Sequence, residues 1–194
     1  PRTTTMKKPF VIAIDGASST GKSTLAKGLA KALGFPHVDS GAMYRGVTLY
    51  VQQHGLIENK KVKTETLLSQ LDDIHLRFEG DTFWLNGVDV SAEIRSMQVS
   101  EAVSLVAAIP EVRTFLVAQQ RIMGANQSVV MDGRDIGTVV FPKADIKLFL
   151  TADVNIRAQR RFDELSAQNT LTSVAEVRNN LAERDHLDST RADS

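Results

Sequence analysis

The segment GASSTGKS, residues 16–23, is the feature of this sequence that most constrains the fold. It fits the pattern G-x-x-x-x-G-K-[ST], in which backbone N–H groups of a glycine-rich turn surround phosphate at the start of a helix. The apolar residues 10–14 before it predict a buried strand, and the leucine-rich residues 25–33 after it predict a helix that ends at Gly34. Strand, turn and helix in this order predict the first unit of a parallel α/β sheet.

The same turn carries the side chains that phosphate chemistry needs. In this motif the lysine, here Lys22, reaches the β- and γ-phosphates of a nucleotide, and the hydroxyl that follows it, here Ser23, binds Mg²⁺. We therefore expect nucleotide phosphates to be bound by Gly16, Ala17, Ser18, Ser19, Thr20, Gly21, Lys22, Ser23 and Thr24.

The rest of the chain alternates between strands and helices, except in its middle. Apolar runs predict sheet strands at residues 36–39, 128–131 and 146–150, and helical patterns occupy residues 40–54, 96–108, 110–123, 153–167 and 174–187. In the middle, short strand patterns separated by turn residues such as Asn86-Gly87 predict an antiparallel β insertion at about residues 62–95. We expect one α/β domain, residues 1–194, with a parallel sheet flanked by helices.

A second polar segment, MDGRDIGT, follows the predicted strand at residues 128–131. Asp132 ends that strand, where phosphate-binding folds place a carboxylate that holds Mg²⁺ or its water ligands. Arg134 and Asp135 follow in the loop, and ligands of open α/β sheets bind at these carboxyl ends. The alternative interpretation is a loop ion pair that uses the glycines as turn residues.

Two sets of charged residues lie at helical spacing near the end of the sequence: Arg157, Arg160 and Arg161, and then Arg184, Asp188 and Arg191. Each set shares one face of a helix. A solvated face with ion pairs is the ordinary interpretation of such a pattern. A phosphoryl-transfer site, however, needs several cations that neutralise the transferred group.

Composition narrows the classes of function. Basic and acidic residues both number 23, whereas a dedicated nucleic-acid-binding protein is usually basic, so we expect no nucleic-acid partner. The absence of Cys excludes disulfides, thiolate metal sites and a Cys nucleophile, and the 4 His residues lack the spacing of metal ligands. No apolar run is long enough to cross a bilayer and no secretory signal begins the chain, so we expect no membrane partner and a cytoplasmic protein.

Together these segments resemble those of the bacterial cytidylate kinases. The resemblance is carried by IDGASSTGKST, DSGAMYR, VSLVAAIPEVR, MDGRDIGTVVFP, RFDEL and ERDHLDSTRA, and it covers nearly the whole chain. Enzymes of this family transfer the γ-phosphoryl group of ATP to CMP or dCMP in pyrimidine nucleotide metabolism. The resemblance implies a P-loop NTPase-type fold, ATP as co-substrate, Mg²⁺, a monomer, and a monophosphate-binding role for the insertion.

The resemblance also implies roles for residues at matching positions. The residues implied to be catalytic are Lys22, Arg134, Arg157, Arg160 and Arg161, the last three in a mobile lid at about residues 155–173 that stays open without ligand. The residues implied to bind CMP are Ser40, Arg45 and Arg134 for its phosphate, Ser104, Arg113 and Asp135 for cytosine, and Arg184, Asp188 and Arg191 for the sugar and nearby atoms. The residues implied to hold the metal ion are Ser23 and Asp132.

The sequence departs from the family pattern in two places. Ala17 stands where the family usually has Pro, which we expect to loosen the phosphate loop without removing a donor. The sequence ends at Ser194, where relatives continue with another strand and helix. We therefore expect the last sheet strand and part of the adenine pocket to be missing from this chain.

Three other functions remain as alternatives. A P-loop kinase for shikimate or AMP would need a different acceptor site. A GTPase-like switch would read guanine with N-K-x-D, but the nearest segment, residues 59–62, reads NKKV and lacks the carboxylate. An inactive binding module conflicts with the intact Lys22, Ser23 and Asp132. An ADP-release assay over several acceptors distinguishes these functions.

Overall fold

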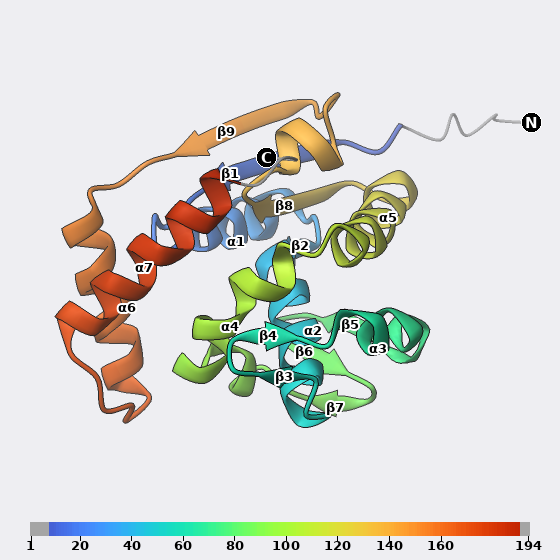
Figure 1. Cartoon of the computed structure of the whole chain (residues 1–194). Coiled ribbons are helices and arrows are strands. Elements are labelled where there is room, and N and C mark those ends of the chain that lie inside the picture. The colour runs from blue at the N-terminus through green and yellow to red at the C-terminus, as the bar shows by residue number, and fades with distance from the viewer. Residues whose placement is uncertain (1–7, 191–194) are drawn as a thin grey trace, which may run out of the picture.

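A parallel sheet forms the centre of the molecule in the computed structural model, which describes residues 8–190. Its strand order is β2-β8-β1-β9, and the strands are β2 (His37–Asp39), β8 (Val129–Gly133), β1 (Val11–Gly16) and β9 (Ile146–Leu150) (Figure 1). All three neighbouring pairs are parallel, which confirms the predicted α/β class. Parallel pairing brings the carboxyl ends of β1, β2 and β8 to one edge, where the loops that follow them meet.

Helices cover both faces of this sheet, because successive side chains of a strand point to opposite sides. Val11 and Ala13 belong to the larger core, whereas Ile12 and Ile14 belong to a smaller core beside Ala26 of the first helix. The helices that flank the sheet are α1 (Lys22–Leu33), α2 (Ser40–Gln53), α4 (Met97–Ala107) and α5 (Pro110–Asn126). A short π-helix, Ile136–Val140, follows β8 and was not expected from the sequence.

The helix predicted at residues 40–54 begins with a serine, a residue type that often caps helices. Ser40 is nevertheless the first residue of α2 and does not cap it. Asp39 is the cap, and its Oδ1 accepts a hydrogen bond from the backbone N–H of Ala42 at 3.0 Å. The Ser40 hydroxyl is therefore available for another partner, described below.

The insertion docks on α2. Its elements are β3 (Ile57–Glu58), β4 (Lys61–Val62), α3 (Thr64–Ser69), β5 (Leu76–Glu79), β6 (Thr82–Leu85) and β7 (Val88–Asp89). The last three strands form the predicted antiparallel sheet, and Asn86 and Gly87 make its second turn with positive φ angles of 49° and 81°. Phe83 is buried against α2 at Gly46, where a Cβ atom would lie 2.8 Å from the Phe83 ring.

Two antiparallel helices project beside the phosphate loop. They are α6 (Val154–Ala167) and α7 (Val174–Ser189), and they pack through a small core of Ala158, Leu165, Val177 and Leu181. A capping box at Ser173 and Glu176 starts α7. Because α7 also contacts α4, this helix connects the projecting pair with the body of the molecule (Figure 1).

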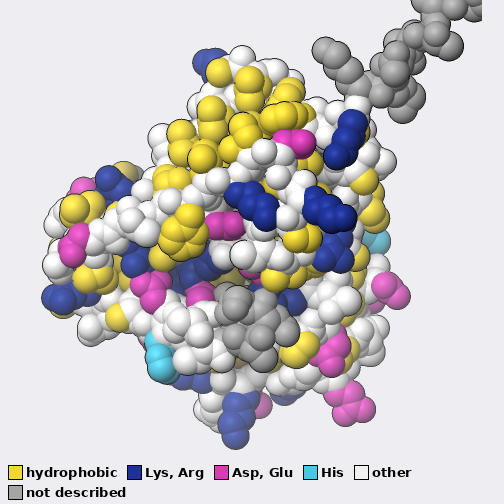
Figure 2. Space-filling model, turned by 90° about the horizontal axis from the view of Figure 1, so that it is seen from above, with side chains coloured by type: hydrophobic (Ala, Val, Ile, Leu, Met, Phe, Trp, Pro, Cys, Tyr) yellow, Lys and Arg dark blue, Asp and Glu magenta, His cyan; other side chains and the backbone are white. Residues whose placement is uncertain are grey.

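Strand β9 lies at one edge of the sheet. Ile146 and Phe149 of this strand are exposed, and Figure 2, which views the molecule from the β9 side, shows hydrophobic side chains gathered on this face. Within residues 8–190, no helix has the length and apolar character that crossing a membrane requires.

Candidate active site

The phosphate loop joins β1 to α1 at the edge where the strands end. Gly16 and Gly21 have φ angles of 156° and 92°, and a Cβ atom at Gly16 would lie 2.5 Å from the carbonyl oxygen of Leu150. Gly21 precedes α1 and has no side chain to cap it, so the first N–H groups of the helix are directed at a ligand site. The loop is therefore built for an anion.

Lys22 lies across this loop. Its Nζ donates to the carbonyl oxygen of Ala17 at 3.2 Å, and the Thr20 hydroxyl donates to the same oxygen at 2.9 Å. Burial, more than any neighbouring charge, lowers the pKa of Lys22 from its ordinary 10.5 to about 8. The loop residues that line the adjoining pocket are Ser18, Ser19, Gly21, Lys22, Ser23 and Thr24.

Asp132 is fully buried and holds a partner at each carboxylate oxygen. The Ser23 hydroxyl donates to Oδ2 at 2.8 Å, and Nε2 of His37 lies 2.6 Å from Oδ1. Hydroxyl and carboxylate oxygens beside bound phosphates are ligands that suit Mg²⁺. Among the described residues no group of three or more His, Asp or Glu side chains could hold a metal by itself. The donor set fits an ion that shares its coordination with phosphate oxygens and water.

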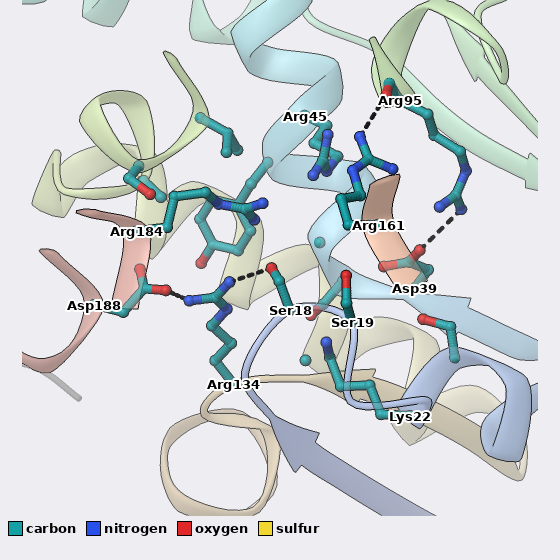
Figure 3. A pocket seen from close by; sticks show the side chains of 18 of the residues that line it. Ser18, Ser19, Lys22, Asp39, Arg45, Arg95, Arg134, Arg161, Arg184 and Asp188 are labelled. Atoms are coloured by element: carbon teal, nitrogen blue, oxygen red, sulfur yellow. Dashed lines mark hydrogen bonds and ion pairs between the residues drawn. The ribbon is translucent and has the colours of Figure 1, made fainter. Parts of the chain in front are cut away.

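A pocket opens between the phosphate loop, α2, α4 and α7, and cations dominate its lining (Figure 3). The basic residues that line it are Lys22, Arg45, Arg95, Arg113, Arg134, Arg161 and Arg184. Burial lowers the pKa of Arg45 to about 9 and that of Arg184 well below its usual range, and repulsion among the arginines adds to both shifts. Cations held together at such a cost indicate a ligand with several negative charges.

The wall formed by α2 and β8 holds Ser40 and Arg45. The Ser40 hydroxyl donates to the carbonyl oxygen of Asp132 at 2.8 Å, and Gly133 permits this approach because a Cβ atom there would collide with the hydroxyl. Nη1 of Arg45 donates to the carbonyl oxygen of Ile94 and to the Ser100 hydroxyl, at 2.9 and 3.0 Å. Both residues line the pocket.

Arg113 and Asp135 form a buried ion pair at another wall of the pocket. Ser104, on α4, lines the pocket beside them. The pair combines a charged donor with a charged acceptor in a desolvated place. Such a pair can offer complementary hydrogen bonds to the polar edge of a planar ring.

Arg134 extends from the loop after β8 toward α7. Its Nη2 donates to the Ser18 hydroxyl at 2.6 Å, and its Nη1 pairs with Asp188 (Figure 3). Arg184, on the same helix as Asp188, has its side chain in the pocket. Arg191 lies outside the described residues.

Two of the three lid arginines, Arg157 and Arg161, are buried and make ion pairs. Arg157 is buried and makes a two-point ion pair with Asp185, at 2.7 and 2.9 Å. Arg161 pairs with Glu164 at 3.0 Å and donates to the carbonyl oxygen of Arg95 at 2.6 Å. The Asp185 and Glu164 carboxylates and the Arg95 carbonyl oxygen are the acceptors of these two guanidinium groups. Arg160 is exposed, and its Nη1 lies 3.5 Å from the carbonyl oxygen of Ser19.

Four further residues of the site were not found from the sequence. Asp15 accepts hydrogen bonds from the backbone N–H groups of Ile136 and Gly137, both at 2.8 Å, and burial raises its pKa. The other three are His37 beside Asp132, Arg95 at the pocket mouth paired with Asp39, and Asp185 beside Arg157. Each becomes visible only once distant segments are brought together.

The matching family model and the relatives most similar in sequence name one family. Residues 12–194 match the family model described as cytidylate kinase. The chain is 53% identical to the cytidylate kinase of Parabacteroides distasonis, over 96% of this chain and 84% of that protein. It is 50% identical to the cytidylate kinase of Bacteroides fragilis and 48% identical to that of Porphyromonas gingivalis, in alignments that cover 95% and 96% of this chain and 83% and 84% of those proteins.

Proposed function

Because the chain belongs to the cytidylate kinase family, it is an ATP-dependent nucleoside monophosphate kinase acting on CMP or dCMP, and we propose that the pocket beside the phosphate loop is where the transfer occurs. The observation that carries this proposal is the pocket lining. Lys22 of the phosphate loop and the buried Arg113–Asp135 pair open into the same cavity as five further arginines. One cavity thus offers a place for donor phosphates, for an acceptor phosphate and for a base.

The donor side binds the phosphates of ATP. The N–H groups at the start of α1 and the Lys22 ammonium stabilise the β- and γ-phosphate charge. Mg²⁺ would be held by the Ser23 hydroxyl and the Asp132 carboxylate, and it would neutralise phosphate charge there. On binding, Lys22 exchanges the Ala17 carbonyl oxygen for a charged phosphate oxygen, which is the stronger acceptor.

The acceptor side binds the nucleoside monophosphate. Ser40, Arg45 and Arg134 surround its phosphate, and the residues assigned to the sugar and nearby atoms are Arg184, Asp188 and Arg191. Arg45 donates to a carbonyl oxygen and a hydroxyl, and Arg134 donates to a hydroxyl. A phosphate oxygen can replace these neutral acceptors. The phosphate is thereby directed toward Lys22, because both phosphate sites line one pocket.

Asp135 and Arg113 read the base, with Ser104 beside them. Cytosine presents an amino donor at N4 beside the acceptors N3 and O2. A carboxylate accepts from the amino group while an arginine or serine donates to the acceptors. Uracil reverses the pattern at N3 and position 4, so the carboxylate would face an oxygen, which makes UMP a poor acceptor.

Phosphoryl transfer requires cations around the transferred group. Charge spreads over the three equatorial oxygens in the transition state, and fixed cations that surround them lower the barrier. Lys22, Arg134 and Arg161 line the pocket, and Arg160 lies beside Ser19 at the mouth of the loop. Arg157 acts on the loop through the carbonyl oxygen of Ser18.

A coupled ADP-release assay tests the proposal. We expect turnover with CMP and dCMP, and little with UMP, AMP, GMP, shikimate or no acceptor. Lys22→Ala should lower kcat/KM by at least about 100-fold, the cost of removing one main charge-stabilising group, without unfolding the protein. Preferred phosphorylation of AMP or shikimate, or normal turnover of Lys22→Ala, would contradict the assignment.

The partners of such an enzyme are small nucleotides and Mg²⁺, and we propose that it works as a cytoplasmic monomer with the insertion and lid as parts of a single domain. The pocket that would hold both nucleotides is formed within one chain. Sedimentation of the ligand-free and ligand-bound protein tests the oligomeric state.

A further inference from the structure

Ser18 of the phosphate loop is held by two arginines that reach it from different elements. Arg134, from the loop after β8, donates from Nη2 to the Ser18 hydroxyl at 2.6 Å. Arg157, from α6, donates from Nε to the Ser18 carbonyl oxygen at 2.7 Å. One residue of the loop is therefore fixed through both its side chain and its backbone.

Both arginines are in turn held by carboxylates of a single helix, α7. Asp188 pairs with Arg134, and Asp185 makes a two-point ion pair with Arg157 at 2.7 and 2.9 Å. Residues three apart on a helix are neighbours on its surface. Helix α7 is thus linked to Ser18 of the phosphate loop twice, each time by a carboxylate that pairs with an arginine.

The Arg157–Asp185 ion pair is well placed to hold Arg157 against the phosphate loop. The Arg157 side chain is 6% exposed and that of Asp185 is 32% exposed, so water screens the pair only in part. Two parallel hydrogen bonds fix the guanidinium plane, and the remaining Nε–H then points at Ser18. Arg161 and Arg184 line the pocket. Arg157 and Asp185 are not among the described residues that line it.

The same helix also faces the acceptor. Arg184, next to Asp185 in the chain, and Asp188, one turn further on, both line the pocket. Under the proposed function, on which this step rests, these two residues contact the nucleoside monophosphate. An acceptor that repositions α7 therefore also moves the Asp185 carboxylate that holds Arg157 on the phosphate loop.

We propose that Asp185 is a positioning residue that couples the two substrate sites: it fixes Arg157 on the Ser18 carbonyl oxygen and so transmits acceptor binding at α7 to the phosphate loop. A rigid helix with contacts at both sites is a physical route for such coupling. Coupling is reciprocal, so CMP raises the affinity for ATP by the factor by which ATP raises the affinity for CMP.

Calorimetric titration with a non-hydrolysable ATP analogue and Mg²⁺, without CMP and with saturating CMP, measures this factor. For the wild-type protein we expect CMP to lower the analogue Kd by about fivefold or more, the lower end of typical couplings. In Asp185→Asn the factor should fall to less than half of the wild-type value, because the amide keeps the shape but loses the negative charge and replaces one of the two acceptor oxygens with an NH2 donor. The Kd for CMP alone should stay within about twofold, since Asp185 is outside the pocket lining.

Glu183→Gln is the matched control, because it removes one negative charge from an exposed position on the opposite side of the same helix. It should keep the wild-type coupling factor. Arg157→Gln should reduce the coupling factor as Asp185→Asn does. The double variant should show no further loss, since both substitutions break the same Arg157–Asp185 ion pair. Should Asp185→Asn fail to fold, Arg157→Lys, which keeps the charge without the planar fork, should show the same loss.

Two results would overturn the inference. One is a wild-type coupling factor near one, and the other is an unchanged factor in a folded Asp185→Asn or Arg157→Lys protein. Failure of CMP to bind the wild-type protein at all is a different result, because it contradicts the proposed function itself. Thermal unfolding of each variant shows which measurements were made on folded protein.

Discussion

At the residue scale, Lys22 connects the electrostatics of the site with pH. Its pKa is about 8 in the ligand-free protein because burial disfavours the ammonium ion. Between pH 8 and the ordinary value of 10.5, the folded chain binds fewer protons here than the unfolded chain. This group's contribution to the free energy of unfolding therefore rises with pH across that window.

The same pKa predicts how ATP capture depends on pH. A neutral lysine cannot pair with phosphate, so kcat/KM for ATP, which reports the free enzyme, should fall as pH rises above about 8. The corresponding fall in kcat should occur at higher pH, because bound phosphates raise the pKa of the lysine. In Lys22→Arg, which keeps its charge, kcat/KM for ATP should not fall near pH 8, even if the activity of this variant is low. An identical fall in Lys22→Arg would assign the titration to another group.

Asp135 should decide between acceptor bases. Asp135→Asn replaces an acceptor-only carboxylate with an amide that can also donate toward a carbonyl at position 4. A hydrogen bond to a charged group contributes about 1.5–3 kcal/mol, so the ratio of kcat/KM for CMP over UMP should fall at least about tenfold.

The structure makes the alternative role of Asp135 concrete, because this carboxylate pairs with Arg113 in a buried contact. If Asp135 only holds Arg113, activity toward both nucleotides should fall together and the ratio should not change. Measuring both acceptors with one protein preparation distinguishes the two roles.

At the element scale, the sequence predicted the elements well where the signals are local. The apolar run before GASSTGKS, the turn at Asn86-Gly87 and the arginine spacing in α6 each act within a few residues. His37 and Asp132, by contrast, are 95 positions apart, and Asp15 and Ile136 are 121 apart. Pairing across such distances depends on strand order, which no single segment contains. The sequence therefore predicted Asp132 but not its partner His37.

The connection between α6 and α7 should report whether the lid moves. This segment, residues 168–173, is largely exposed, and Leu171 has its full side chain in solvent. If the helices close on the phosphates of both nucleotides, thermolysin cleavage at this segment should slow in the presence of CMP and an ATP analogue. Cleavage near the exposed Ile122, on α5 and outside both the lid and the insertion, serves as the internal control. Equal protection at both places would indicate overall stabilisation instead of lid closure.

At the scale of the whole molecule, a formal net charge of zero conceals an uneven distribution. Arg45, Arg134, Arg161 and Arg184 lie around one pocket, and the charges of the first three lower the pKa of Arg184. Cations gathered this way destabilise the empty protein and are relieved by an anionic ligand. Stability and ligand binding therefore oppose each other at this site.

Arg184 gives the sharpest test of that opposition. Its side chain is buried, its pKa is lowered by burial and by neighbouring arginines, and within residues 8–190 its Nε has no hydrogen-bond partner. Replacing a poorly compensated buried charge with an apolar side chain is often stabilising. Arg184→Met should therefore raise the free energy of unfolding of the ligand-free protein by about 1 kcal/mol, an increase in Tm of about 3 °C for a domain of this size.

The same substitution should remove most of the stabilisation that CMP provides. A ligand that binds only the folded state raises its stability by RT ln(1 + [L]/Kd), so weaker binding shows directly as a smaller Tm shift. Arg178→Met is the matched control, because it removes an exposed arginine from the same helix and should change neither Tm nor the CMP shift appreciably. Thermal scans of the three proteins, with and without CMP, make the comparison. A lower Tm of ligand-free Arg184→Met, with the CMP shift retained, would show that Arg184 supports the fold and does not serve the ligand.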